Sequence, residues 1–459
     1  MRTRMNRRAF LDVVLGSAWA ASAYQAKSSW SAGVAAVDIT PEESLWMAGY
    51  ARRSQPSHGV ALPLHAKALA LQAGGQAPVV LVTVDLLGVT ARMTDRIAAQ
   101  VQRRHGIRRA DLLFNASHTH CGPIVDEQLS VAYDLSMTQW NAIRAYTLRL
   151  EEKLVVLIGE ALGRLRPARV AYGHGRAAFA ANRRVKFSPD GPVDHSVPVL
   201  RVDHADGRPL AIVFGYACHN TTLPDTFVQY HGDYAGVAQA ALEQRHRGTV
   251  ALFVAGCGAD ANPKPRGTVE LVQAHGAALA DAVDRALPTV LPVAPALRTA
   301  YVSVELPFVG PDAREQWKRQ LGIPDVYLRR HAQAMDELLV RYGRLPPSQL
   351  EPVQVWKFGA AAPNDSTKSG SAMTLVALGG EVVVDYALRL AREYPRQAMW
   401  VAGYSNDVFG YVPSLRVLRE GGYEGADAMI YYARPGPFTD TVEEAIVGQV
   451  RRLMSMEEQ

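Results

Sequence analysis

Short apolar runs alternate with longer amphipathic segments along most of the chain. Runs of five to nine apolar residues are typical of strands buried on both faces, whereas apolar residues that recur every three or four positions indicate helices. This pattern predicts strands at 79–87, 111–116, 209–217, 250–255, 300–308, 373–378 and 398–402. It predicts helices at 92–104, 138–165, 234–245, 269–286 and 382–392, and a mostly helical segment at 316–342 that breaks near 322–324.

The order of these elements, strand followed by helix, favours an α/β fold with much parallel sheet. We predict a mixed multi-stranded sheet core with flanking helices and an active site at the C-terminal ends of the strands. Two polar stretches rich in Gly, Pro and Ser, 343–352 and 359–371, are interpreted as loops, because the apolar strands on both sides belong to one sheet system.

Unusual polar residues follow five of the apolar runs, at the point where each run ends. In open α/β sheets, ligands bind beyond the carboxyl ends of the strands, so one site formed by all five segments is a natural expectation. The five segments are 115–123, 218–220, 256–263, 379–381 and 404–407.

The first of these segments contains His118-Thr119-His120. In an extended segment, side chains two positions apart point to the same side, so both imidazoles can face one cavity. Neutral imidazole is the commonest metal ligand in proteins. A pair of hydrogen-bonded loop histidines explains the same pattern equally well.

His219 and Glu381 lie in two of the other segments. A lone histidine after a strand usually packs or makes a hydrogen bond, and a glutamate before an apolar helix usually caps that helix. Two histidines and one carboxylate together would nonetheless form a catalytic zinc site with an open position for water. Zinc would lower the pKa of that water and polarise a carbonyl.

Other chemistries find little support in the sequence. Cys121, Cys218 and Cys257 are too few, and wrongly spaced, for a disulfide scaffold or a cysteine-built zinc site. No residue is placed to orient a Cys-His pair. The chain has no G-x-S-x-G serine motif, no P-loop and no dinucleotide-binding glycine fingerprint.

The first 23 residues have the layout of an export signal. Arg2, Arg4, Arg7 and Arg8 precede an apolar run from 13 to 21, and an A-x-A site ends at Ala23. The segment 6–11 also resembles a twin-arginine signal. The apolar run is short for a membrane anchor, so we predict a signal peptide over 1–23 and a periplasmic or secreted protein.

Composition is that of an ordinary globular protein, with 48% hydrophobic and 20% charged residues. The formal charge of +5 comes partly from the four arginines of the signal segment. No run of Lys and Arg marks a nucleic-acid surface, so we expect no nucleic-acid partner.

The polar segments, taken together, resemble a known family. H-T-H-x-G-P at 118–123 is the most specific match, and the others follow in family order. They are an aromatic strand ending in His219, H-G-D-Y-A-G at 231–236, G-A-D-A-N-P at 258–263, G-E at 380–381, Y-V-P-S at 411–414 and Y-E-G-A at 423–426. Earlier segments at 38–41 and 47–50 also fit. From about residue 33 to 435 the chain resembles the neutral/alkaline non-lysosomal ceramidases.

This resemblance implies a zinc-dependent hydrolase that cleaves an N-acyl amide bond with zinc-activated water. A ceramide-like lipid is the leading substrate class, and such a substrate allows peripheral contact with a membrane. The implied zinc ligands are His118, His219, Glu381 and Tyr411. His120 and Tyr423 would stabilise the oxyanion. The implied substrate-contacting or supporting residues are His231, Asp233, Asp260, Asn262 and Arg183, and Arg183 alternatively belongs to a solvated basic turn.

The chain departs from the family pattern at three points. Asn262 stands where the ceramidases carry a serine that matters for activity, and Cys121 stands where a serine is usual. We expect one catalytic domain over 24–459 without the C-terminal immunoglobulin-like domain of the ceramidases, as in a shorter bacterial branch. The alternatives are a zinc hydrolase of another amide or ester, and a non-catalytic binding protein on the same fold.

Overall fold

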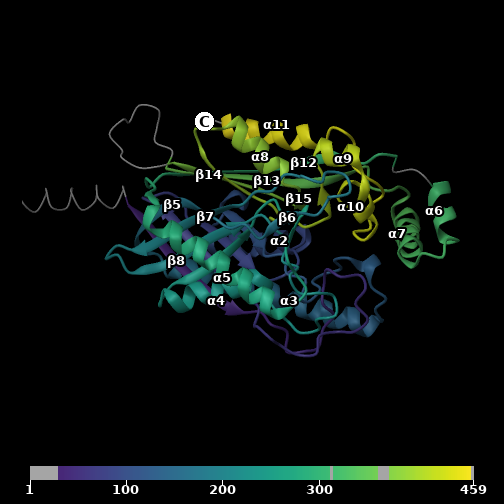
Figure 1. The fold of residues 1–459 in the computed structure, drawn as a ribbon, viewed down its shortest axis with the longest axis horizontal. Helices are drawn as coiled ribbons and strands as arrows, with labels where there is room; N and C mark the ends of the chain where they lie inside the picture. Colours follow the sequence, from purple (N-terminus) through teal and green to yellow (C-terminus); the bar gives the residue numbers. More distant parts are fainter. Residues whose placement is uncertain (1–28, 311–313, 360–371, 456–459) are drawn as a thin grey trace, which may run out of the picture.

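Two sheets pack face to face in the computed structural model, which describes residues 29–310, 314–359 and 372–455 (Figure 1). The predicted signal segment and nearly all of the predicted loop 359–371 lie outside the described residues. The larger sheet has nine strands, with β11 (Leu291–Pro292) paired to β5. The order of the other eight is β4 (Leu112–Ala116), β3 (Val79–Val84), β2 (His65–Ala73), β1 (Trp30–Asp38), β5 (Arg166–Arg176), β7 (Ser196–His204), β8 (Pro209–Tyr216) and β9 (Val250–Ala255).

The second sheet has four strands, in the order β12 (Leu297–Pro307), β13 (Ser348–Phe358), β14 (Met373–Leu378) and β16 (Ala398–Ala402). Two short pairs complete the strands. One joins β6 (Ala180–Asn182) to β10 (Ala261–Pro263), and the other joins β15 (Glu381–Val382) to β17 (Tyr411–Val412). Both short pairs carry residues of the predicted site.

Alternation along the strands explains why both sheets are apolar on both faces. In β3, Val80 and Val82 face one core, whereas Val79 and Leu81 face the core between the sheets. In β14, Met373, Leu375 and Ala377 face that same inter-sheet core, while Val376 and Leu378 turn to the outside helices. Because side chains alternate along a strand, a run that is apolar at every position is buried on both faces.

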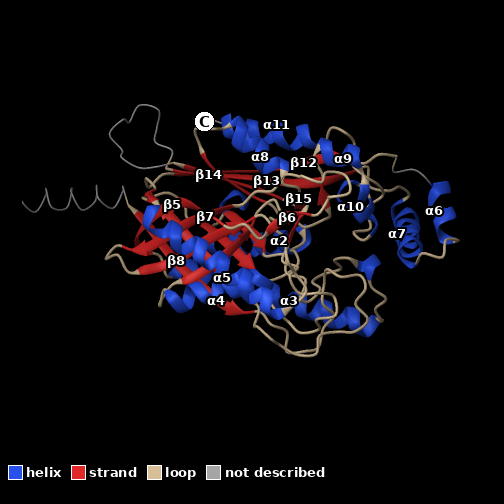
Figure 2. Cartoon of the chain, viewed as in Figure 1, coloured by secondary structure: helices blue, strands red, loops and turns tan. Residues whose placement is uncertain are grey.

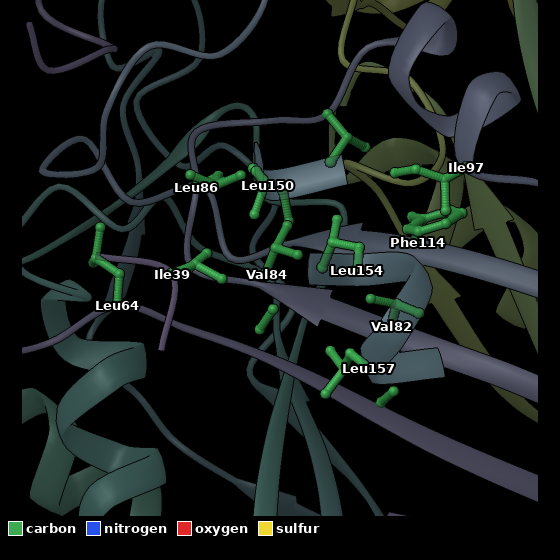
Figure 3. Close-up of a cluster of buried hydrophobic side chains, with 14 of the residues drawn as sticks. Ile39, Leu64, Val82, Val84, Leu86, Ile97, Phe114, Leu150, Leu154 and Leu157 are labelled. Atoms are coloured by element: carbon green, nitrogen blue, oxygen red, sulfur yellow. The ribbon is translucent and has the colours of Figure 1, made fainter. Parts of the chain in front are cut away.

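Helices cover the outer faces of both sheets (Figure 2). On the larger sheet, α2 (Ala91–His105) and α3 (Met137–Gly163) cover one half, and α4 (Asp233–Arg245) and α5 (Val269–Ala286) cover the other. Figure 3 shows Ile97 of α2 and Leu150, Leu154 and Leu157 of α3 meeting the strand residues Val82, Val84 and Phe114. On the second sheet, α8 (Asp385–Glu393) and α11 (Val442–Ser455) cover the outer face. The layers therefore run helix, sheet, sheet, helix.

Helix α2 illustrates how the local sequence determines where a helix begins, which side it buries and where it ends. The Thr90 side chain accepts a hydrogen bond from the backbone N–H of Met93, which caps the N-terminus. Met93, Ile97 and Val101 recur every four residues and are buried against the sheet. Gly106 then adopts a left-handed conformation with φ of 72° and ends the helix.

The predicted mixed α/β sheet core with flanking helices is confirmed, but several details of the prediction are wrong. Parallel pairing joins β3 to β4, β8 to β9, β14 to β16 and β15 to β17, whereas most of the described pairs are antiparallel. Residues 348–352 form the start of β13 and not a loop, because they pair with β12. The helix predicted at 382–392 starts at Asp385, since the two residues before Val383 pair with β17.

The three long parallel pairs place their carboxyl ends around one centre. Isolated bridges join the following loops directly, linking Thr119 to Asn220 and Asn115 to Ser405. Asn115 also donates to the carbonyl of Gly403 at 2.8 Å and accepts from the N–H of Ala255 at 2.8 Å, which ties three strand ends together. The predicted convergence of the strand ends is therefore confirmed.

None of the helices in the described part of the chain combines the length and the apolar character needed to cross a membrane.

Candidate active site and metal centre

The loop after β4 carries His118 and His120. His118 has a positive φ of 61°, so the segment is not extended as the sequence predicted. Its backbone N–H donates to the carbonyl of Leu86, and its Nδ1 lies 2.7 Å from the carbonyl of Leu87. Both imidazoles still face one centre, because Nε2 of His118 and Nε2 of His120 are 3.3 Å apart. A non-glycine residue held at positive φ is a strained conformation that is common at functional sites.

His219 reaches the same centre from the end of β8. Its backbone N–H donates to the carbonyl of Ala261, and its Nδ1 lies 2.9 Å from the carbonyl of Gly258. A proton on Nδ1 of His118 and of His219 satisfies these carbonyls and leaves the lone pair of each Nε2 directed at the centre. Backbone carbonyls orient metal-binding histidines in this way.

Glu381 enters from the second sheet, where β15 pairs with β17 and sets Glu381 opposite Tyr411. Its Oε2 lies 3.1 Å from Nε2 of both His118 and His219. The turn before it needs Gly380, which has φ of 67°; a Cβ there would lie 2.5 Å from the Val412 side chain. The turn therefore allows the carboxylate to meet the histidines.

Tyr411 completes the cluster. Its hydroxyl lies 3.2 Å from Nε2 of His219 and accepts a hydrogen bond from Nη2 of Arg183 at 2.9 Å. Arg183 in turn donates from Nε to Glu424 at 2.6 Å. Arg184 pairs with Glu420 and Glu424. The alternative of a solvated basic turn is wrong, because both arginines are held by carboxylates next to the cluster.

The protonation states suit a divalent metal ion. Burial, followed by the Arg183 charge, lowers the pKa of His219 to about 4, and burial lowers the pKa of His120 well below its usual value. Burial alone would raise the pKa of Glu381, but the neighbouring imidazoles outweigh burial and hold it well below its usual value. Neutral imidazoles and an ionised carboxylate are the forms that bind zinc.

The donor atoms are also close enough to share one ion. The ligand nitrogens of His118, His120 and His219 all lie within 4.8 Å of one another, and these three residues are buried. Together with Glu381 and Tyr411 they form a nitrogen and oxygen donor set, to which we refer below as the histidine cluster. The residues present therefore fit a zinc ion.

A cavity of about 390 Å³ opens onto the histidine cluster. Its wall includes His118, His120, Glu381 and Tyr411, and much of the remainder is aromatic or apolar. Tyr423 stands at the mouth, 43% exposed, with its ring 5.3 Å from that of Tyr411. The other aromatic and apolar lining residues are Tyr50, Tyr327, Tyr431, Tyr432, Ala51, Leu87, Leu129 and Ala132.

Six of the predicted site residues lie outside the lining of this cavity, and two of them, His219 and Arg183, are described above. The carbonyl of His231 accepts a hydrogen bond from the hydroxyl of Thr119, which lies between His118 and His120, and Asp233 accepts from the N–H of Leu223. Asp260 is buried and accepts from the N–H of Val384 at 2.9 Å, just beyond Glu381. Burial raises the pKa of this carboxyl to about 6.

Asn262, which also lies outside the cavity lining, sits on β10, where its backbone pairs with Ala181 of β6. Its side-chain oxygen accepts from the hydroxyl of Thr221 at 3.4 Å. Asn262 directly follows Ala261, whose carbonyl accepts from the N–H of His219.

Three residues at the site were not predicted from sequence. Tyr432 donates a hydrogen bond to Oε1 of Glu381. Arg53 donates to the carbonyl of His120 at 2.8 Å, and the Tyr50 ring lies 4.7 Å from the His120 ring. The family-like segment at 47–50 was a signal for Tyr50. No sequence motif indicated a role for Tyr432 or Arg53.

The fold and the site define a mixed α/β protein with a candidate metal centre where strand ends of both sheets meet. Residues 30–269 match the family described as neutral/alkaline non-lysosomal ceramidase, N-terminal. The chain belongs to this family. His118, His120 and His219 lie inside the matched range, and Glu381, Tyr411 and Tyr423 lie beyond it.

Individual relatives agree with this assignment. The chain is 24% identical to neutral ceramidase A of Dictyostelium discoideum over 264 residues, which are 52% of this chain and 37% of that protein. It is 24% identical to neutral ceramidase B of the same organism over 263 residues, 52% of this chain and 36% of that protein. The chain thus spans a little over a third of the length of these curated relatives.

Solved structures show the same fold. The neutral ceramidase of Pseudomonas aeruginosa superposes with a TM-score of 0.69 at 17% identity, over 94% of this chain and 76% of that one. A structure described as ceramidase complexed with C2 gives a TM-score of 0.69 at 16% identity, over 94% of this chain and 77% of that one.

Proposed function

We propose that this protein is a zinc-dependent hydrolase that cleaves the N-acyl amide bond of a ceramide-like lipid. One observation carries the proposal: Oε2 of Glu381 lies 3.1 Å from Nε2 of both His118 and His219, and His118 and Glu381 line an open cavity. Such a set leaves one side of the centre free for substrate, as catalytic zinc sites do.

Zinc held by His118, His219, Glu381 and Tyr411 would supply an activated water and polarise the amide carbonyl. Side chains of the protein supply the hydrogen-bond donors for the reaction. Within the described residues, Nδ1 of His120 has no hydrogen-bond partner, so its single proton is free to sit on Nε2 and be donated toward the centre. Tyr423 offers a second hydroxyl donor from the mouth of the cavity. Two such donors would stabilise the oxyanion that forms on the carbonyl.

The cavity also suits an amide with an apolar acyl group. Leu87, Leu129 and Ala132 belong to a small apolar cluster that continues from the cavity wall. Arg52, Asp225 and Asp325 give the mouth a polar rim. An acyl chain would pack against the apolar cluster, while a hydroxylated head group would contact the polar rim. Export to the periplasm or the medium, directed by residues 1–23, would give the enzyme access to lipids outside the cytoplasm.

The test is release of free fatty acid from N-acylsphingosine by the zinc-loaded protein, with the metal content measured on the same sample. We expect release that stops on chelation and returns with added zinc. A matched acyl ester of the same chain length distinguishes an amidase from an esterase. A zinc-containing protein that releases nothing from the amide would contradict the proposed substrate class, and a folded protein that takes up no zinc would contradict the metal.

A further inference from the structure

An exposed apolar turn joins α6 (Arg314–Leu321) to α7 (Val326–Tyr342). Every residue from 321 to 326 is exposed, and the turn includes Leu321, Ile323 and Val326, each more than a third exposed. Large apolar side chains gathered at one exposed point are unusual on a soluble surface and mark a place of contact. Figure 1 shows α6 and α7 at the edge of the molecule, beyond α10 (Gly422–Gly425).

The turn is held in place by the helices that flank it. Trp317 of α6 is buried against α7, with its ring 5.1 Å from that of His331. The Asp325 carboxylate accepts hydrogen bonds from the N–H groups of Tyr327 and Leu328 and so caps α7. Arg329 donates to the carbonyl of Ile323. The apolar side chains are therefore presented outward by an ordered support.

The turn adjoins the mouth of the cavity. Asp325 and Tyr327 line the cavity, and the hydroxyl of Tyr327 donates to the carbonyl of Ala51 at 3.1 Å. The Tyr327 ring lies 5.3 Å from that of Tyr431, which lies 6.2 Å from that of Tyr423. A row of aromatic rings thus leads from the apolar turn along the rim of the cavity.

A second exposed apolar group continues this row. Phe187 is 41% exposed, and its ring packs over Gly422, where a Cβ would lie 2.7 Å from it. Gly422 directly precedes Tyr423. Val185, two residues before Phe187, is also exposed. Exposed apolar side chains therefore lie at both ends of the aromatic row, with the mouth of the cavity beside it.

Cations accompany both apolar groups. Lys186 adjoins Phe187 with its Nζ 5.8 Å from the ring centroid, and Arg319 is exposed two residues before Leu321. Arg52, which lines the mouth, is exposed as well. Apolar side chains that enter the acyl region, bordered by Lys and Arg at the level of the head groups, are typical of surfaces that lie on a bilayer.

We propose that the turn 321–326, together with Phe187, docks on a lipid bilayer and points the cavity mouth at the membrane. This inference rests on the proposed function, because a lipid amide would then pass from the bilayer into the cavity without crossing water. A protein partner or a second copy on the same surface would instead cover the mouth through which the substrate must pass.

The first experiment measures co-sedimentation of the full zinc-loaded protein with vesicles of phosphatidylcholine, and of phosphatidylcholine with phosphatidylglycerol. The test variant is Leu321→Ser/Ile323→Ser. The matched control is Val340→Ser, an exposed apolar residue near the other end of α7. We expect the wild type and the control to bind, and the test variant to bind about 10-fold more weakly or worse. Equal binding by the test variant, or no binding by the wild type, would overturn the proposal.

The second experiment compares turnover of a ceramide carried in vesicles with turnover of a water-soluble short-chain N-acyl amide. The test variant should lose turnover only on vesicles. A wild type that cleaves the soluble amide but does not bind vesicles would refute the docking and leave the proposed function standing. A wild type that binds vesicles through the turn but cleaves neither amide would refute the function instead. If the same substitutions turn a dimer into a monomer, the turn is a self-association surface and the proposal is wrong.

Discussion

The phenol of Tyr432 donates a hydrogen bond to Oε1 of Glu381. The other carboxylate oxygen of Glu381 faces the histidine cluster, so the two oxygens have separate partners. A carboxylate held at one oxygen presents the other in a fixed direction. Partners of this kind, which touch a metal ligand but not the metal, orient the ligand and tune its affinity.

We therefore expect Tyr432→Phe to weaken zinc binding and turnover by about 10- to 100-fold, because Glu381 would lose its anchor and turn more freely. Zinc affinity is measured by competition with a chelator of known affinity, and turnover at saturating zinc is measured beside it. The matched control is Tyr431→Phe, which removes a phenol from the same cavity wall without touching Glu381. Equal zinc affinity in the two variants would contradict the anchoring role.

Much of the fold could be predicted from hydrophobic periodicity. Helix α5 and strands β9, β14 and β16 have the predicted bounds, because their patterns are strong and their ends carry clear signals. Strand β2 was missed, since its alternating alanines give little strand signal and its partners are β1 and β3. The start of β13 was predicted to be a loop because Pro352 and its polar neighbours have little strand propensity. These residues form a strand because they pair with β12.

The candidate site could be predicted in part. His118, His120 and His219 follow apolar strands, and that position is visible in the sequence. Tyr411 and Tyr423 came only from the family resemblance, because a tyrosine carries no metal-ligand spacing of its own. Side-chain contacts between distant segments cannot be read from local pattern. The hydrogen bond between Glu381 and Tyr432, which are 51 positions apart, is such a contact.

Removal of a histidine from the cluster tests the metal centre directly. We expect His219→Ala to lower the zinc content from about one ion per chain to near zero and to abolish turnover, with the fold intact by circular dichroism. His118→Ala should behave in the same way. The control is His231→Ala, a buried histidine outside the cavity, which should keep its zinc. Unchanged turnover in His118→Ala would exclude the proposed ligand set.

Tyr423 offers a test of oxyanion stabilisation. Loss of one preorganised donor lowers the rate of acyl transfer by about 100-fold in well-studied enzymes. Because Tyr423 is partly exposed at the mouth, we expect Tyr423→Phe to lower kcat by about 10- to 100-fold and to leave KM nearly unchanged. Tyr327→Phe, at the same rim, should leave kcat unchanged. A change in KM alone would assign Tyr423 to substrate binding.

The buried Glu351 should make the stability of the protein depend on pH. Glu351 on β13 is fully buried, and within the described residues neither carboxylate oxygen has a hydrogen-bond partner. Burial, reinforced by the charge of Asp407, raises the pKa of Glu351 well above its usual value. The folded protein therefore keeps this proton at a pH where the unfolded chain releases it. The free energy of unfolding should then fall as pH rises above about 4.5, until the folded-state pKa is reached.

Glu351→Gln replaces the protonated acid by a neutral group of the same shape. The substitution should therefore remove the fall in the free energy of unfolding that Glu351 causes as pH rises. Relative to the wild type, the free energy of unfolding of the variant should rise by up to about 1.4 kcal/mol for each pH unit between about pH 4.5 and the folded-state pKa. Urea unfolding of both zinc-loaded proteins from pH 5 to pH 8 measures the difference. Glu305→Gln, on the exposed face of β12, is the control and should show no pH-dependent gain. A constant difference at every pH would mean that Glu351 is ionised in the folded protein.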